Sequence, residues 1–293
     1  MARELLDTSQ VFRDHITACE TALAPHTDWS LTHVLTQHPD APTLDRVDVV
    51  QPTLFAVLTG LAEIWKAHGI HPDTVLGHSQ GEIAAAYTAG ALTLTDATTI
   101  VALRAQALAT LTGTGTMASL TLTPHDTTQL LTHHPHLHIA AVNGPTTTII
   151  TGPTPHIDQL LHHCTTHHIH ARKIPVDYAS HSPHIDPLHH TIQQALTHIT
   201  PQPTTTTYCS GMTGTIIDTT TLTGDYWFTS MRQPVQFHKA TQTLLNTGHT
   251  LYIETSPHPV LTTALTQTTE HHTNNQTNPN NPPGHTPITI TGT

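Results

Sequence analysis

The stretch TVLGHSQGEIAAAYTAG at residues 74–90 decides the fold. It predicts a short strand at Thr74–Leu76, a tight turn, and a helix of small residues over Gln80–Ala89. The turn carries the pattern G-x-S-x-G with Ser79 at its centre, which in this context is typical of a nucleophile elbow: glycines on both sides let the serine project from the sheet edge. Ser79 is therefore the predicted nucleophile. The amide of Gln80 and the helix N-terminus are expected to face the oxyanion that forms when a serine attacks a carbonyl.

The sequence around this stretch predicts helices packed about one short strand. The segment Val47–His68 carries an apolar stripe typical of a buried helix, with Pro52 near its beginning. Thr95–Asp96 is a helix start signal, and the helix is expected to run to about Leu111, where glycines follow. Residues 1–115 are therefore predicted to form the first part of a large domain.

The pattern changes from about Thr116 to Val176, where short apolar segments alternate with two helical ones. Strands are expected in MASLTLT, HLHIAAVN, TTTIITG and HARKIPV, helices in PHDTTQLLTHH and PHIDQLLHHCTTHH, and a turn at Asn143–Pro145. The order βαββαβ is that of a ferredoxin-like unit. Residues 116–184 are therefore predicted to form a small domain inserted in the larger one.

The sequence then returns to the large domain over residues 185–269. We expect a helix near Pro187–Ile199, a strand-and-loop region at Thr204–Ile217, a helix near Pro234–Leu245, a strand at His249–Glu254 and a helix from about Pro259. The stretch EHHTNNQTNPNNPPG at residues 270–284 is rich in Asn and Pro and typical of a linker. Residues 270–293 are predicted as this linker and a terminal segment.

Charge and composition exclude several classes of function. The 293 residues include 9 Lys and Arg against 20 Asp and Glu, and only 10% of the chain is charged. Nine scattered basic residues do not form a stripe that would neutralise a row of phosphates, so nucleic acid is not expected as the main partner. Every apolar run is expected to be interrupted before 18 residues, so no membrane-spanning helix is predicted.

The N-terminal sequence and the cysteines predict a cytoplasmic location. The N-terminal sequence MARELLDTSQ lacks the apolar core of a signal peptide. The three cysteines, Cys19, Cys164 and Cys209, are odd in number and widely separated, which favours a reducing compartment without a disulfide framework.

The 29 histidines have two interpretations. Pairs such as His133-His134 and His162-His163 lie in polar stretches where other proteins carry charged residues or Gln, which indicates a compositional bias of the surface. A metal site needs ligands that converge on one point, as in H-E-x-x-H, and that motif is absent. We therefore predict no metal site, and a His-rich metal-binding protein remains the alternative.

The predicted nucleophile needs a base, and the residues alone do not identify it. With so many histidines, neither spacing nor composition selects one, and no Asp stands out as a third member of a triad.

Several motifs occur in an order that resembles a known family. The chain carries RVDVVQP (46–52), GHSQGEIAAAYTAGAL (77–92), AVNGPTTTIITG (141–152), YASHSPHID (178–186), RQPVQF (232–237) and IETSPHPVL (253–261). Together they resemble the acyltransferase domain of modular type I polyketide synthases, relatives of malonyl-CoA:acyl carrier protein transacylase. The resemblance implies an α/β hydrolase-like large domain with an inserted ferredoxin-like small domain, and an active site in the cleft between them.

The resemblance also assigns roles to residues. Ser79 corresponds to the nucleophile that takes the acyl group, and His181 to the base that activates it. In this family a backbone carbonyl orients the base, and the corresponding position is Gln233. Arg104 resembles the arginine that holds the free carboxylate of the substrate, a role that suits the planar, bidentate guanidinium.

Substrate preference follows from three motif variants. Relatives that choose malonyl units usually carry His-Ala-Phe-His where this chain has Tyr178-Ala179-Ser180-His181. Ser180 in place of Phe leaves room for a methyl branch beside the α-carbon of the substrate. Gln51 in RVDVVQ and Gln80 after the nucleophile are likewise variants of the methylmalonyl type. One methyl group is worth about 1–3 kcal/mol in a pocket, so we expect a preference for methylmalonyl and not an absolute choice.

The implied activity is ping-pong acyl transfer from methylmalonyl-CoA to the phosphopantetheine thiol of an acyl carrier protein, without a bound cofactor or metal. Its implied partners are that carrier and the ketosynthase and linker regions of the same megasynthase. The alternatives are a serine thioesterase or esterase, or a catalytically weak structural segment of a megasynthase. Arg104 favours transfer over hydrolysis, because it binds a free carboxylate.

The sequence departs from the family at its start. The family opens with a strand and a G-Q-G-S-Q turn, whose first Gln supplies a second oxyanion amide, and this sequence begins just after that point. The resemblance therefore implies one central strand and one oxyanion donor fewer, and such a donor is typically worth about 10²–10³ in rate.

Overall fold

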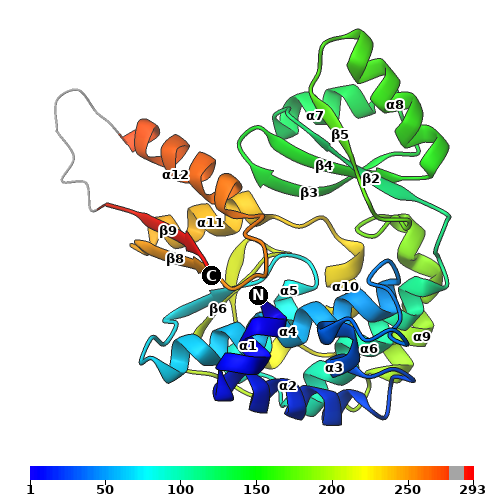
Figure 1. Cartoon of the computed structure of the whole chain (residues 1–293). Coiled ribbons are helices and arrows are strands. Elements are labelled where there is room, and N and C mark those ends of the chain that lie inside the picture. Colours follow the sequence, from blue (N-terminus) through cyan, green and yellow to red (C-terminus); the bar gives the residue numbers. More distant parts are fainter. Residues whose placement is uncertain (277–286) are drawn as a thin grey trace.

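Strand β1 (Thr74–Leu76) forms one edge of a three-stranded sheet in the larger part of the molecule (Figure 1). The computed structural model describes residues 1–276 and 287–293. β1 pairs in parallel with β6 (Thr207–Ser210), and β6 pairs antiparallel with β7 (Thr215–Ile217). Helix α5 (Gly81–Ala89) packs directly on β1 and β6. The helices that share its apolar core are α2 (Gln10–Leu23), α4 (Val47–Ala67), α6 (Leu94–Ala109), α9 (His189–Ala195) and α10 (Gly224–Arg232). Their apolar faces form one large core, in which Trp227 is fully buried.

Local signals explain the helices next to β1. α5 consists mainly of small apolar residues and ends at Gly90, whose φ of +87° suits a residue without a side chain. α6 begins where the Thr93 hydroxyl accepts the amide of Asp96 and donates to its carboxylate. The strand predicted at Thr74–Leu76 and the helix predicted at Gln80–Ala89 are confirmed as β1 and α5. α6 starts at Leu94, one residue before the predicted start signal, because Thr93 provides the cap.

Helix α4 requires a correction of the sequence analysis. Among the described residues, it is the helix whose length and mean hydropathy of 1.4 would by themselves allow it to cross a membrane. The expectation that polar residues interrupt every apolar run too early is therefore wrong for α4. In the fold, 67% of this apolar window is buried, which is typical of a core helix. The buried hydroxyl of Thr59 in α4 donates a hydrogen bond to the carbonyl oxygen of Phe55, 2.8 Å away.

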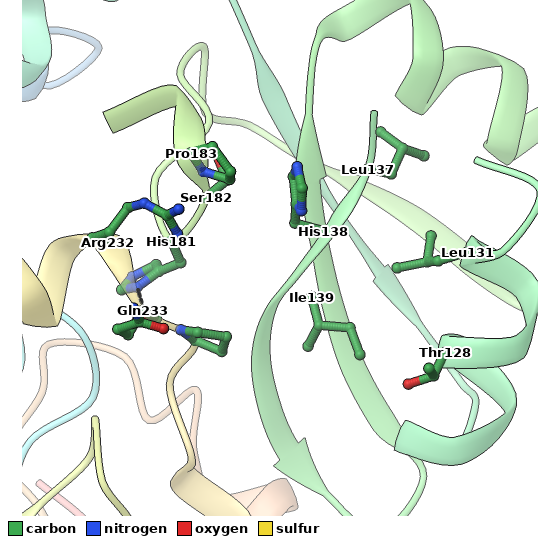
Figure 2. A pocket seen from close by; sticks show the side chains of 11 residues that line it. Thr128, Leu131, Leu137, His138, Ile139, His181, Ser182, Pro183, Arg232 and Gln233 are labelled. Atoms are coloured by element: carbon green, nitrogen blue, oxygen red, sulfur yellow. Dashed lines mark hydrogen bonds between the residues drawn. The ribbon is translucent and has the colours of Figure 1, made fainter. Parts of the chain in front are cut away.

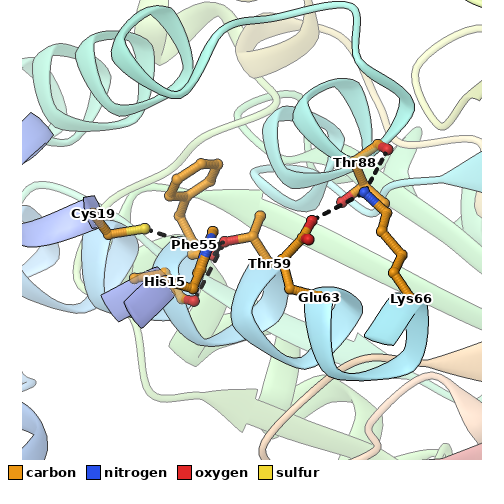
Figure 3. Close-up of polar contacts among 8 residues, drawn as sticks. His15, Cys19, Phe55, Thr59, Glu63, Lys66 and Thr88 are labelled. Atoms are coloured by element: carbon orange, nitrogen blue, oxygen red, sulfur yellow. Dashed lines mark hydrogen bonds and ion pairs between the residues drawn. The ribbon is translucent and has the colours of Figure 1, made fainter. Parts of the chain in front are cut away.

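Buried polar contacts join α4 to its neighbours (Figure 3). His15 on α2 lies 2.7 Å through Nε2 from the hydroxyl of Thr59, and Cys19 Sγ lies 3.3 Å from the same nitrogen. Lys66 donates to Glu63 and to the carbonyl of Thr88 at the end of α5. His15 is thus a hydrogen-bonded core residue rather than a surface one. Over the described ranges, no three His, Cys, Asp or Glu side chains gather so as to hold a metal ion.

The smaller part is a four-stranded antiparallel sheet, drawn in green in Figure 1. Its elements follow the chain as β2 (Thr116–Leu120), α7 (Pro124–Leu131), β3 (His138–Gly144), β4 (Thr147–Gly152), α8 (Thr154–Thr166) and β5 (Ala171–Ile174), and the strands lie in the order β3-β4-β2-β5. The buried side of the sheet packs on α8 through Ile150, Ile157 and Leu160. The predicted βαββαβ order is confirmed, and the chain combines a large α/β part with a small ferredoxin-like part.

Hydrogen bonds join the two parts beside the elbow. Val235 donates its amide to Ala140 on β3 at 2.9 Å and accepts the amide of Val142 at 2.8 Å. The imidazole of His78 lies 2.8 Å from the amide oxygen of Asn143. The small sheet is therefore attached directly to the turn that carries Ser79. The boundaries predicted for the domains, at residues 115/116 and 184/185, remain predictions.

The C-terminal half contains several elements that differ from expectation. α10 (Gly224–Arg232) was not predicted, and the helix expected near Pro187–Ile199 is a 3₁₀ turn at Pro183–Leu188 followed by α9. The helix and strand expected next are α11 (Phe237–Asn246) and β8 (Leu251–Glu254). The remaining described helices are α1 (Ala2–Thr8), α3 (Leu31–Thr36) and a 3₁₀ turn at Thr219–Thr221.

The predicted linker is partly wrong. α12 (Thr262–Gln276) continues through residues 270–276, and its first half is anchored by the buried side chains of Ala264, Leu265 and Thr268. Residues 277–284 of that prediction lie outside the described residues. Beyond them, β9 (Thr289–Gly292) pairs in parallel with β8, where the sequence analysis expected no strand.

Candidate active site

The turn after β1 holds Ser79 in a strained conformation. Ser79 has a φ of +54°, in the left-handed region that residues other than glycine rarely adopt. A Cβ on Gly77 would lie 2.2 Å from the backbone nitrogen of Glu82, so only glycine fits there. A Cβ on Gly81 would meet nothing within 4 Å. The predicted elbow is present, but steric contact requires glycine only at Gly77 and not at Gly81.

The structure brings Ser79 and His181 together, although 102 positions separate them in the chain. Ser79 Oγ lies 2.8 Å from His181 Nε2, and His181 Nδ1 lies 2.7 Å from the carbonyl oxygen of Gln233. The backbone amide of His181 donates to the carbonyl of Met231 at 2.8 Å. His181 is only 5% exposed and has a φ of +58°. The end of α10 therefore holds both the backbone and the ring of this histidine.

These contacts define the state of the imidazole. A carbonyl oxygen only accepts, so Nδ1 carries the proton and Nε2 is left to accept from the Ser79 hydroxyl. Burial lowers the pKa of His181 to about 4, the charges of His78 and Arg104 act in the same direction, and the bond to Gln233 opposes them. At neutral pH the ring is uncharged and able to take a proton, which is what a general base requires.

Arg104 is a buried cation with free donors. It lies on α6 and is 3% exposed, and its buried Nε and Nη1 atoms have no hydrogen-bond partner within residues 1–276 and 287–293. Burial lowers the pKa of Arg104 to about 10, against the opposing charge of Glu82, so the guanidinium is charged at neutral pH. A desolvated, unpaired guanidinium is costly, and a carboxylate fits two of its donors at once.

The other predicted pocket residues lie near these groups. Gln51 on α4 donates through Nε2 to the hydroxyl of Tyr178 at 3.3 Å. The charge of Arg104 is among the influences on the pKa of Tyr178, which burial raises above its ordinary value. Ser180 is buried. Gln80 occupies the N-cap of α5, and its side-chain oxygen is buried without a partner, so it offers a further polar atom to a ligand.

A pocket of about 400 Å³ opens on His181 between the two parts of the molecule (Figure 2). One wall is the end of α10 with Gln233, and the facing wall is β3 with His138 and Ile139. The remaining lining residues are Thr128, Leu131, Leu137, Ser182, Pro183, Arg232 and Pro234. The pocket therefore leads to His181, and its lining includes neither Ser79 nor Arg104.

The sequence analysis missed Glu82. This residue follows the elbow in α5, is 1% exposed, and accepts hydrogen bonds from the Tyr226 hydroxyl and the Met212 amide. The available signal was an acidic residue at the start of a helix made otherwise of small apolar residues, in a chain with few charges. Its partners lie 130 and 144 positions away, so no local pattern would have named them.

Comparisons with known proteins show what the chain as a whole is similar to. A family model described as "Acyl transferase domain" matches residues 1–281. Polyketide synthase GfsE of Streptomyces halstedii is 48% identical over 271 residues, which cover 92% of this chain and 7% of that protein. The chain thus corresponds to a small portion of this relative's length.

Solved structures are similar over the whole chain. The acyltransferase domain from module 8 of the salinomycin polyketide synthase matches with a TM-score of 0.94 and 41% identity, covering 100% of this chain and 67% of that one. A loading acyltransferase from the avermectin modular polyketide synthase matches with a TM-score of 0.93 and 41% identity, covering 100% and 89%.

Proposed function

Because this chain belongs to the acyl transferase domain family of modular polyketide synthases, we propose that it transfers a methylmalonyl unit from CoA to the phosphopantetheine thiol of an acyl carrier protein. The observation that carries the proposal is the array of Ser79, His181 and Gln233 beside an unpaired, buried Arg104. The array supplies a nucleophile and base, and the arginine supplies a partner for the free carboxylate that distinguishes this substrate from simple acyl groups.

The proposed first half-reaction forms an acyl-enzyme. Ser79 Oγ attacks the thioester carbonyl while His181 Nε2 takes the hydroxyl proton. The oxyanion of the tetrahedral intermediate faces the Gln80 amide and the N-terminus of α5. Collapse of the intermediate breaks the C–S bond, and His181 returns the proton to the departing CoA thiolate. The 2.8 Å contact between Oγ and Nε2 supports this proton path.

The second half-reaction reverses the sequence with a new thiol. The carrier's phosphopantetheine thiol loses its proton to His181 and attacks the ester on Ser79, and Ser79 leaves as its hydroxyl. The pocket between α10 and β3 gives such an acceptor a route to His181. We propose the ketosynthase and linker regions of a megasynthase as the neighbouring partners, a cytoplasmic location, and no bound metal or organic cofactor.

The choice of the extender unit depends on the segment before His181. Ser180 is small and buried, which supports room for the α-methyl group, and Tyr178 is held by Gln51 from α4. Intact-mass spectrometry after mixing the chain with equal amounts of malonyl-, methylmalonyl- and ethylmalonyl-CoA tests the proposal. We expect the methylmalonyl adduct to dominate; a dominant malonyl or ethylmalonyl adduct would contradict it.

Exchange of this segment is expected to shift the preference. In a double variant with Tyr178→His and Ser180→Phe, an aromatic ring occupies the proposed place of the α-methyl group. We expect the ratio of kcat/KM for methylmalonyl-CoA over malonyl-CoA to fall by about 10- to 200-fold, which corresponds to about 1–3 kcal/mol. Competition between the two esters measures this ratio even if crowding slows both. An unchanged ratio would mean that other residues shape the pocket.

The pH dependence tests the state of His181. An ordinary imidazole would protonate near pH 6.5 and lower the acylation rate tenfold for each further unit of acidification. With the pKa of His181 lowered to about 4, we expect no such fall from this histidine between pH 6.5 and 5, and a steep loss only near pH 4. The measurement uses the Glu82→Gln variant, which lacks the buried carboxyl group whose own pKa is raised to about 7. Single-turnover acylation after a pH jump measures this. Because an unfolded histidine binds a proton below pH 6.5 and this one does not, stability also falls from pH 6.5 towards 4, so the jump must be brief.

A further inference from the structure

Glu82 is a buried acid that the acyl-transfer steps do not use. It lies in the first turn of α5, three residues after Ser79, and is 1% exposed. Burial of a carboxylate is costly unless donors surround it. Its contacts connect two separate parts of the active site.

The backbone of Glu82 is bonded to the nucleophile. Its amide donates to the carbonyl oxygen of Ser79 at 3.0 Å. Gly77 lies so close that a Cβ there would be 2.2 Å from both the nitrogen and the Cα of Glu82. The positions of the elbow and of Glu82 are therefore fixed relative to each other.

The side chain of Glu82 is bonded to the element that holds the base. Its Oε1 accepts from the Tyr226 hydroxyl at 3.0 Å and from the Met212 amide at 3.2 Å, and Ser210 Oγ lies 2.7 Å from the same Tyr226 hydroxyl. Tyr226 lies on α10, and the end of α10 supplies the carbonyls of Met231 and Gln233 that fix His181. One continuous path of bonds thus runs from Ser79 through Glu82 and α10 to His181.

We propose that Glu82 is a positioning residue that sets Ser79 Oγ against His181 Nε2, with its amide on the elbow and its carboxylate on α10. This inference rests on the proposed roles of Ser79 and His181. Small displacements are costly in such a pair, since about 1 Å of misplacement costs about 10²-fold in rate. The dyad geometry therefore depends on the negative charge of Glu82, because an ionised carboxylate accepts hydrogen bonds more strongly than a neutral amide or carboxyl oxygen.

The charge state of Glu82 follows from its surroundings. Burial raises its pKa to about 7, while the Tyr226 hydroxyl and the Met212 amide donate to the ionised form and oppose that rise. Tyr208 and Cys209 on β6 and the positively charged Arg104 on α6 also interact electrostatically with this carboxylate. Above pH 7 the group is a carboxylate that accepts from its partners. Below pH 7 it carries a proton of its own, and its hold on α10 weakens.

The test uses a neutral alkyl fluorophosphonate ester, which reacts with an activated serine and needs no carboxylate site. The rate of Ser79 labelling is measured by intact mass at pH 8 and pH 6 in the unaltered chain, Glu82→Gln, Tyr226→Phe and the double variant. At pH 8 we expect Glu82→Gln to be about 10- to 100-fold slower and Tyr226→Phe about 10-fold slower. The double variant should be no slower than Glu82→Gln, because both act through one bond. At pH 6, where about one-tenth of Glu82 is ionised, the unaltered chain should label about 5- to 10-fold more slowly than at pH 8, whereas the Glu82→Gln rate should not change.

Controls separate positioning from general damage. Glu63→Gln and Tyr252→Phe alter a partly buried acid and tyrosine away from the dyad and should label at the normal rate. Thermal unfolding identifies the folded variants, and Tyr226→Phe tests the path alone if Glu82→Gln does not fold. Three results would overturn the inference. The first is labelling of Glu82→Gln or Tyr226→Phe within twofold of the unaltered rate at pH 8. The second is additive losses in the double variant, and the third is the same deficit of Glu82→Gln relative to the unaltered chain at both pH values. If the unaltered chain is not labelled at Ser79, the proposed nucleophile itself is wrong.

Discussion

The Ser79→Ala variant is expected to form no acyl adduct with any CoA ester. The substitution removes the atom that would carry the acyl group while leaving the fold of the elbow possible, since alanine is smaller than serine. In related serine–histidine chemistry, loss of the nucleophile costs on the order of 10⁶ in kcat. Intact-mass spectrometry at saturating methylmalonyl-CoA measures the adduct directly.

The matched control for this prediction is Ser119→Ala on β2, far from the dyad in sequence and in a different sheet. It should load normally. A full-stoichiometry adduct on Ser79→Ala would move the nucleophile to another residue, and the contact between Ser79 and His181 would then need another explanation.

The Arg104→Ala variant is expected to lose carboxylated substrates selectively. Removal of the guanidinium leaves the substrate carboxylate desolvated and unpaired, which costs about 3–5 kcal/mol, or roughly 200- to 5,000-fold in kcat/KM. Propionyl-CoA brings no carboxylate to that position and should change far less. Acyl-loading kinetics with methylmalonyl-CoA and propionyl-CoA measure the two losses side by side.

Two further variants sharpen this result. Arg104→Lys keeps a charge but not the bidentate fork, so we expect an intermediate loss. Arg172→Ala removes an exposed arginine from β5 in the small sheet and should affect neither substrate. Equal losses for both CoA esters in Arg104→Ala would show that Arg104 supports the fold instead of the substrate.

The parts of the fold that the sequence predicts well are those with local signals. β1 and α5 are found at their expected places because a short apolar run, a glycine-flanked turn and a run of small residues follow each other within 17 positions. The βαββαβ order is similarly local, since each of its strands and helices carries its own apolar pattern. Such elements need no knowledge of distant residues.

The elements that were missed depend on distant partners. α10 buries Tyr226, Trp227 and Met231, but its short sequence carries a glycine and four polar residues that obscure the pattern. β9 exists as a strand because it pairs with β8, more than thirty positions earlier. The polar second half of α12 continues a helix whose apolar anchors lie in its first half.

The candidate site divides in the same way. The spacing around Ser79 identifies it from local pattern alone, whereas His181 is one histidine among 29 and needed a whole motif to single it out. Arg104 was singled out by the family resemblance, and the structure adds a physical reason, since two of its buried nitrogens have no hydrogen-bond partner among the described residues. The sequence does not identify Glu82 as a site residue, because its proposed role depends on hydrogen bonds from Met212 and Tyr226, which lie far from it in the chain.

The most direct test of the account is a two-stage transfer followed by mass spectrometry. The chain is first mixed with methylmalonyl-CoA, freed of excess ester and digested to locate the adduct. A carrier protein bearing phosphopantetheine is then added to the undigested acyl form. We predict one methylmalonyl group on the peptide that contains Ser79, and its quantitative movement to the carrier thiol. An adduct on another residue, or release of free methylmalonate to water in place of transfer, would contradict the account.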